Sequence, residues 1–248
     1  SLHTADEALS ESGMHCLISL RALVAMTLSC LVFVTSSSAC AVGMVPETPI
    51  VIVDEGLGEA TLNVKNSDDQ PALLYSTLEH IAEDSEPLVL LAPPVARVEP
   101  GKSQQVRFIM RATAPLKTER LKRVVFEGIK PSQDGTGARI SLGVRQNIPL
   151  IVRPANLAVD RTPWRRLVWS VVGDKVEVSN PSPYVVRLAK SVTLLPGGAV
   201  LDLGRTYILP DERLVLEASS LLGTHVRLSP ASAYGFAVGS YDAPLSRH

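Results

Sequence analysis

Short runs in which apolar and polar residues alternate cover most of the chain after residue 42. Residues 60–64 (ATLNV) and 103–110 (SQQVRFIM) show this period of two, which is typical of strands with one buried face. Turn-forming clusters such as residues 66–71 separate the runs. No long segment keeps a helical period between a start signal and a stop signal. The pattern predicts an all-β protein.

The other strands are expected at similar intervals along the chain. We expect them at residues 50–53, 72–78, 88–92, 123–129, 140–152, 167–171, 175–179, 184–195, 205–209, 213–216 and 233–239. Many short strands at even spacing imply β-sandwich architecture, and 248 residues suggest two sandwiches. Pro154 ends the longest run, so we place a first domain at residues 42–154 and a second at 155–248.

Residues 1–41 are interpreted as a leader that contains a secretory signal peptide. Arg21 precedes an apolar run at residues 22–35, and the small residues 39–41 (ACA) follow it as a cleavage site. The run is shorter than the roughly 20 residues that a membrane span needs. The alternatives are an uncleaved anchor or a buried helix.

Two details of the leader stay open. Met14 and Met26 are both candidate start residues, because the polar stretch before them does not begin with methionine. Lipid attachment at Cys40 is a weaker alternative to simple cleavage, since the leucine that usually precedes such a site is absent.

Composition narrows the function further. The 24 basic and 25 acidic residues give a net charge of -1, and only 4% of residues are aromatic, so we expect no nucleic-acid partner. Cys16, Cys30 and Cys40 all precede the proposed cut, so the mature chain has no disulfide and no cysteine ligand or nucleophile. We predict no metal, no cofactor and no catalytic residue, because no metal-binding spacing, nucleophile elbow or phosphate loop is present. A Ser/His/Asp set assembled by folding stays open, without positive support.

Four segments in order resemble the PapD-like periplasmic chaperones of the chaperone–usher pilus pathway. They are the turn at residues 93–102 (PPVARVEPGK), the strand at 140–154 (ISLGVRQNIPLIVRP), the turn at 178–184 (VSNPSPY), and the closing segments at 208–210 and 233–235. The resemblance covers nearly all of residues 42–248. It implies two immunoglobulin-like sandwiches set at an angle, in a boomerang arrangement.

The resemblance also implies how such a protein binds. Members of the family lend a strand to pilus subunits whose own fold lacks one, which is a form of β-strand addition. The donor side chains of the family fall at Ile140, Leu142 and Val144, which share one face of a strand at period two. The strand pattern taken alone favours the alternative that these three side chains face their own core.

The sequence departs from the family at the site that holds the subunit's C-terminal carboxylate. Typical members use an arginine and a lysine there, and the matching positions are Ile50 and Pro149. Neither side chain can donate a charged hydrogen bond. Arg145 and Arg153 are the nearest bases that could compensate, although each could also be a solvated strand charge. The stretch at residues 147–150 (NIPL) resembles the divergent, archaic branch of the family, in which a proline occurs near this point.

Other prominent residues are interpreted as structural. Pro94, Pro100, Gly101, Asn180, Pro181 and Pro183 are expected to set turns, Tyr184 to pack beside its turn, and Trp164 and Trp169 to anchor a core or the domain boundary.

The function implied by the resemblance is a periplasmic chaperone that passes pilus subunits to an outer-membrane usher. An exposed donor edge is an aggregation hazard, so self-association or the loop at residues 131–137 is expected to cover it. One alternative is a structural pilus subunit or adhesin built from the same sandwich. Another is an immunoglobulin-like carbohydrate-binding module, for which the sequence has few aromatic residues.

Overall fold

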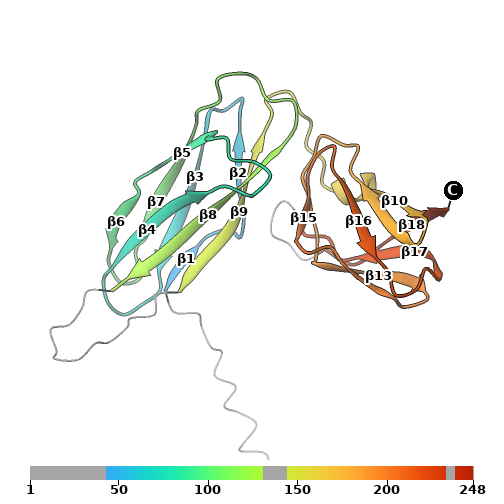
Figure 1. The fold of residues 1–248 in the computed structure, drawn as a ribbon. Helices are drawn as coiled ribbons and strands as arrows, with labels where there is room; N and C mark the ends of the chain where they lie inside the picture. Colours follow the sequence, from blue (N-terminus) through green and yellow to red (C-terminus); the bar gives the residue numbers. More distant parts are fainter. Residues whose placement is uncertain (1–42, 131–143, 233–237, 248) are drawn as a thin grey trace, which may run out of the picture. The chain divides into compact units, whose positions relative to one another are not determined.

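Among the described residues, the regular elements are strands, apart from one short 3₁₀ turn at Pro163–Arg166 (Figure 1). The structure is a computed structural model that describes residues 43–130, 144–232 and 238–247. The strands form two groups of sheets, one before Pro154 and one after Leu167. Within the described ranges, no helix is long and apolar enough to cross a membrane. The prediction of an all-β protein with two sandwiches is confirmed.

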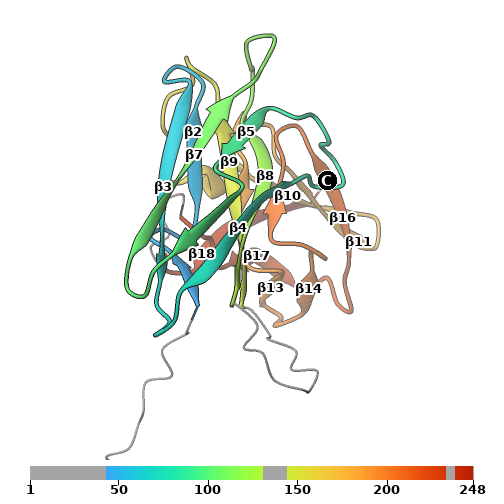
Figure 2. The same ribbon diagram turned by 90° about the vertical axis from the view of Figure 1, so that its left-hand side faces the viewer.

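The first sandwich consists of a four-stranded and a five-stranded sheet, which can be followed in Figures 1 and 2. The four-stranded sheet has the order β1 (Met44–Pro46), β3 (Glu59–Asn66), β7 (Ser103–Met110) and β5 (Val89–Ala92). The five-stranded sheet has the order β2 (Val51–Asp54), β9 (Arg145–Arg153), β8 (Arg120–Ile129), β4 (Ala72–Glu79) and β6 (Val95–Val98).

The inner faces of these two sheets form one apolar core, as their alternating sequences require. From the four-stranded sheet come Leu62, Val64, Val106 and Phe108, and from the five-stranded sheet Leu74, Val124, Phe126, Leu150 and Val152, all at most 2% exposed. Burying each such side chain contributes roughly 1.5–3 kcal/mol before the cost of ordering it is counted.

The chain changes sheets between its first two strands. β1 pairs antiparallel with β3 in one sheet, whereas β2 pairs parallel with β9 in the other. In the connection, the Thr48 hydroxyl donates a hydrogen bond to the carbonyl of Ile50 at 2.8 Å. Because β2 begins only after this crossing, it covers just the second half of β9.

The second group contains a seven-stranded and a two-stranded sheet around a separate core. The larger has the order β14 (Val200–Asp202), β13 (Ser191–Pro196), β17 (Gly223–Leu228), β18 (Tyr241–Arg247), β10 (Val168–Val172), β11 (Lys175–Ser179) and β16 (Arg213–Glu217). The smaller pairs β12 (Val186–Arg187) with β15 (Tyr207–Ile208). Trp164 and Trp169 are both buried in this core, which confirms their interpretation as anchors.

One expected strand is divided in the structure. The run at 184–195 reads as continuous in the sequence, but it forms β12 and β13 with a break between them. At the break, the N–H of Leu188 donates to Thr206 and the N–H of Ala189 donates to Ser229. The chain therefore leaves one sheet for the other, and the expectation of a single strand was wrong.

Five strands were missed, namely β1, β6, β14, β17 and β18, and β6 lies inside the segment 93–102 that was expected to be a turn. One prediction falls largely outside the described ranges. β17 and β18 were not expected, although they pair with each other in the middle of the seven-stranded sheet. Pro244 lies inside β18, where a proline argues against a central strand. It is tolerated there because the pairing of β18 with β10 begins at the next residue, Leu245. Most of the strand expected at 233–239 lies outside the described residues.

Candidate functional site

The first half of β9 has a strand partner on one side only. β8 pairs with β9 from Arg145 to Val152, whereas the pairing with β2 begins at Leu150. Within the part of the chain that the structure describes, no strand pairs with the other side of residues 145–149. The backbone groups on that side can therefore pair with a strand from another chain.

The alternation along β9 shows which face of this edge is apolar. Ile148, Leu150 and Val152 point into the first core. Val144 has the same parity, is 44% exposed and lies beside Gly43, where an added Cβ would be 3.4 Å from the Val144 Cβ. Ile140 and Leu142 lie outside the described residues. The donor set of Ile140, Leu142 and Val144 therefore stays a prediction.

The two positions that match the family's carboxylate-binding pair are used for packing. Ile50 is 5% exposed and belongs to a small apolar cluster with Leu121 and Ile151. Pro149 is buried and lies directly opposite Arg123 on the neighbouring strand β8. The cluster around Ile50 also contains Val185, from the second group of strands.

Arg153, one of the two bases expected to compensate, already holds a buried carboxylate. Its Nε donates to Oε1 of Glu119 at 3.1 Å, and the two side chains are 9% and 5% exposed. The other oxygen, Oε2, accepts the backbone N–H of Val185 at 3.0 Å. Burial raises the pKa of Glu119 in spite of these two donors. Glu119 thus ties β9 to the chain that follows the turn at Asn180.

Arg145, the other expected base, is paired on the outer face of the five-stranded sheet. Its guanidinium donates to Glu79 on β4, and Nδ2 of Asn147 donates to the other oxygen of the same carboxylate at 3.4 Å. Arg123 completes this group, since its Nε and Nη2 donate to the side chain and the backbone carbonyl of Asn147 at 2.7 and 2.9 Å.

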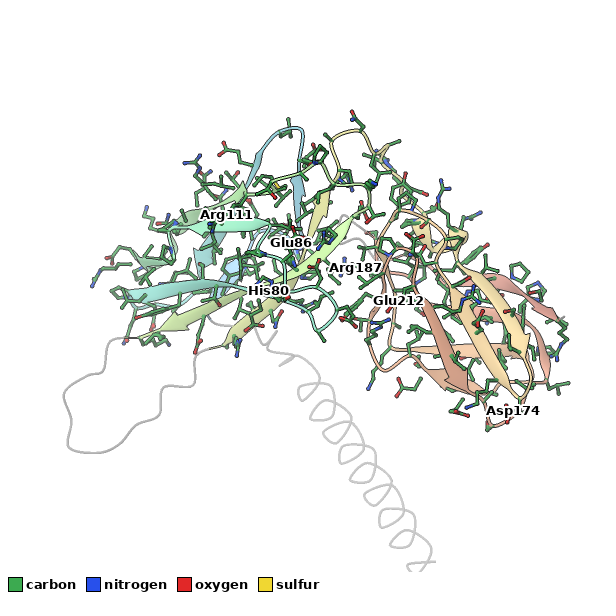
Figure 3. The ribbon with its side chains drawn as sticks, turned by 45° about the horizontal axis from the view of Figure 1, so that its top comes forward. His80, Glu86, Arg111, Asp174, Arg187 and Glu212 are labelled. Carbon is green, nitrogen blue, oxygen red and sulfur yellow. The ribbon has the colours of Figure 1, made fainter. Side chains whose placement is uncertain are left out.

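Arg123 and Arg187 form no ion pair within the part of the chain that the structure describes, and the sequence alone singled out neither of them. Among the described residues, no carboxylate oxygen lies within 4.0 Å of a side-chain nitrogen of Arg123 or Arg187, the latter labelled in Figure 3. Arg187 donates to the carbonyl of Ser232, at 3.3 Å. Burial lowers the pKa of both arginines, and the positive charge of Arg123 lowers the pKa of Arg187 further. Both cations are therefore partly desolvated.

A different ion cluster closes the connection between β4 and β5. The Asp84 carboxylate forms ion pairs with Nε of Arg120 and Nζ of Lys122, both at 2.7 Å. The Lys122 side chain is only 4% exposed. Although burial would raise the pKa of Asp84, the hydrogen bonds from these two bases outweigh it and lower the pKa to about 2. Every charge of this cluster has a partner, which is the pattern of a structural ion pair.

No metal centre is formed by the described residues, because no three His, Cys, Asp or Glu side chains gather as ligands there. The turn predicted at Gly101 has a positive φ of 70°, which favours glycine. Arg97 and Glu99 beside it form an exposed pair at 2.8 Å. These observations support a turn-setting role for this segment. The loop at 131–137 lies outside the described residues.

Two family models match the chain. Residues 43–158 match the model described as pili and flagellar-assembly chaperone, PapD N-terminal domain. Residues 162–240 match the model described as pili assembly chaperone PapD, C-terminal domain. The first match covers the first group of strands, and the second match begins before the second group.

Individual proteins agree with the family models. The chain is 43% identical over 216 residues to the uncharacterized fimbrial chaperone YhcA of Escherichia coli K12, covering 86% of this chain and 96% of that protein. A solved structure of the Salmonella enterica SafA pilin in complex with the SafB chaperone matches with a TM-score of 0.69 and 25% identity, over 84% of this chain and 99% of the other. The Escherichia coli chaperone DraB matches with a TM-score of 0.68 over 82% and 99% of the two chains; at 22% identity it supports the fold alone.

Proposed function

Because the chain belongs to the family of PapD-like pilus assembly chaperones, we propose that it holds pilus subunits by adding a strand to them along the free edge of β9. The observation that carries this proposal is the unpaired side of residues 145–149, where β2 has not yet begun. A subunit that lacks a strand would complete its sheet on this edge.

The energetics of such an addition follow from the geometry of a strand. Main-chain hydrogen bonds supply adhesion that does not depend on sequence, and alternate side chains fill pockets in the groove of the subunit. Val144 has the same parity along the strand as Ile148 and Leu150, and the proposed donors Leu142 and Ile140 have this parity in the sequence. Burial of each aliphatic side chain in a subunit would contribute roughly 1.5–3 kcal/mol, from which the cost of ordering the segment is subtracted.

The partners proposed for this chain are pilus subunits and an outer-membrane usher. The SafB chaperone binds the SafA pilin in the solved complex, and the same kind of partner is proposed here. The donor edge also makes self-association of the free chaperone an expected side reaction. We propose no nucleotide, metal or other cofactor, and an activity that is binding rather than catalysis.

The proposed site of action is the periplasm, where fimbrial chaperones of this family work. The signal peptide within residues 1–41 and its cleavage at residues 39–41 lie outside the described residues and remain part of the proposal. The domain limits of 42–154 and 155–248 are also part of the proposal. Assignment to the archaic branch of the family, which rests on Pro149, is also a proposal.

Hydrogen exchange tests the proposed strand addition directly. Among residues 145–148, the amides that point away from β8, which are every second one along the strand, are expected to exchange more slowly in a chaperone–subunit complex than in the free chaperone. Two other edge strands, β6 and β16, serve as internal controls and are expected to keep their rates. Protection at β6 or β16 with none at residues 145–148 would place the subunit elsewhere and refute the proposal.

A further inference from the structure

Three consecutive polar residues, Arg145, Gln146 and Asn147, lie on the part of β9 whose outer side is free. Arg145 and Asn147 lie on the outer face of the five-stranded sheet, where both donate hydrogen bonds to the Glu79 carboxylate. Gln146 points to the opposite face, because successive side chains of a strand alternate. Within the described ranges, the Gln146 carboxamide has no hydrogen-bond partner. Its hydrogen-bonding capacity is therefore unused, unlike that of its two neighbours.

The row of side chains to which Gln146 belongs is otherwise apolar. Gln146 has the same parity along β9 as Ile148 and Leu150, which belong to the first core. Its direct cross-strand neighbour on β8 is Phe126, which is 0% exposed. Val144 precedes it by two residues and is 44% exposed. One half-buried carboxamide thus interrupts an apolar row at the point where this row leaves the core for the free edge.

The side chain that closes this end of the core from the other sheet is apolar as well. Met44 of β1 is only 1% exposed and packs over Gly128, where an added Cβ would be 2.9 Å from the Met44 Cγ. Gly128 lies two residues after Phe126 on the same face of β8. The surroundings of Gln146 therefore favour a hydrocarbon side chain, and packing within the sandwich does not explain a glutamine at this position.

An added strand would change the surroundings of this carboxamide. In the free chaperone, a half-buried amide at an unpaired edge keeps access to water, whereas a strand laid along the edge covers it. A carboxamide has two N–H donors and a carbonyl acceptor, and leaving them buried without partners costs free energy. Residues directly opposite each other in paired strands share a face and have Cβ atoms about 5 Å apart. The partner residue opposite Gln146 therefore decides whether the carboxamide keeps a hydrogen bond.

We propose that Gln146 selects partner strands that carry a hydroxyl or amide side chain directly opposite it, between apolar residues beside Val144 and Ile148. A wholly apolar strand would bury the carboxamide unpaired. A strand shifted by two residues would place its own polar residue against Val144 or Ile148 and lose the same hydrogen bond. Gln146 thus sets the register of the added strand as well as the choice of partner, as a single buried polar residue does in coiled coils. This inference rests on the proposed strand addition.

The test uses the seven-residue peptide Glu-Leu-Lys-Xaa-Lys-Leu-Glu, in which Xaa is threonine or valine, with a fluorophore at its N-terminus and an amide at its C-terminus. Threonine and valine have nearly the same shape, so the two peptides differ in one hydroxyl group. The sequence reads the same in both directions, so the result does not depend on the direction of the added strand. Fluorescence anisotropy with the whole mature chaperone measures each dissociation constant. The threonine peptide is expected to bind about 10-fold more tightly, which equals about 1.4 kcal/mol.

Variants of the chaperone assign the preference to Gln146. Gln146→Leu replaces the carboxamide by a hydrocarbon of similar size and is expected to remove the preference for threonine, whereas Gln146→Asn is expected to keep part of it. Gln104→Leu is the matched control. Gln104 is a half-buried glutamine of the same sandwich, on β7, and its carboxamide already donates to the carbonyl of Gln105 at 2.7 Å. This control is expected to keep the full preference, and thermal unfolding confirms that each variant is folded.

The remaining outcomes separate this inference from the proposed function. If both peptides bind with equal affinity and slow amide exchange within residues 145–148, strand addition stands and the role of Gln146 is overturned. A threonine preference that survives in folded Gln146→Leu would show that another group reads the hydroxyl, which also overturns it. If neither peptide binds even at millimolar concentration, strand addition at this edge fails and the inference fails with it.

Discussion

Arg153, at the end of β9, and Glu119, immediately before β8, form an ion pair whose side chains are only 9% and 5% exposed. The same carboxylate accepts the N–H of Val185, so three segments of the chain meet at one buried group. This arrangement explains why Arg153 is held in place rather than available to a partner. It also makes Glu119 a sensitive point for stability.

Glu119→Ala is expected to lower the free energy of unfolding by about 3–5 kcal/mol, because it leaves the Arg153 charge buried without a partner. Urea denaturation at neutral pH measures this change. Glu99→Ala is the matched control: it breaks the exposed pair with Arg97, whose side chains are 61% and 54% exposed, and should cost about 1 kcal/mol or less. Equal losses in the two variants would contradict the buried role of Glu119.

Low pH should reduce the free energy of unfolding through protonation of Asp84. Its pKa of about 2 in the folded protein lies below its ordinary value of 3.8, so the unfolded chain binds more protons between these values. The stabilisation that Asp84 provides is therefore fully present above about pH 4 and is lost as the pH falls toward about 2. In Asp84→Asn this part of the pH dependence is absent, and the variant is less stable at neutral pH because Lys122 is left unpaired.

The measurement is urea denaturation of both proteins at a series of pH values. The difference in unfolding free energy between the wild type and Asp84→Asn should shrink as the pH is lowered from about 5 to about 2. A difference that stays constant over this range would show that Asp84 does not titrate as described.

Asn180 is expected to be the most sensitive residue of its turn. Its side chain is completely buried, donates to the carbonyls of Tyr184 and Leu209, and accepts the hydroxyl of Ser182 at 2.6 Å. Asn180→Ala leaves these groups without partners, and each buried unsatisfied group costs about 1–3 kcal/mol. We predict that the thermal midpoint falls well beyond that of the control Asn63→Ala, where a half-buried asparagine loses an exposed hydrogen bond to Glu47. Similar midpoints would show that water replaces the lost bonds.

The alternation of side chains was enough to predict many strands, because one buried face leaves a clear period of two. β7 and β11 begin and end at the residues expected from the sequence. β13 and β14 pair across the turn at Gly197 and Gly198. β18 was not predicted, and Pro244 argues against a central strand in the sequence. Only the structure shows that the pairing of β18 with β10 begins at Leu245, one residue after the proline.

The site was less predictable than the fold, for a physical reason. The free side of residues 145–149 depends on the register at which β2 pairs with β9, and no local spacing in the sequence indicates that register. The sequence did show that Ile50 and Pro149 cannot hold a carboxylate. It pointed to Arg145 and Arg153 as the nearest bases, and only the structure shows that each already has a carboxylate partner.

Co-purification from the periplasm of the native host, comparing the wild type with Leu142→Asp, tests the central claim of strand donation most directly. Leu222→Asp, at a leucine that is 67% exposed in the second group of strands, is the matched control. A small secreted β-protein is predicted to purify with the wild type and with the control, and to be lost from a folded Leu142→Asp chaperone. Retention of the same partner by folded Leu142→Asp would contradict the account.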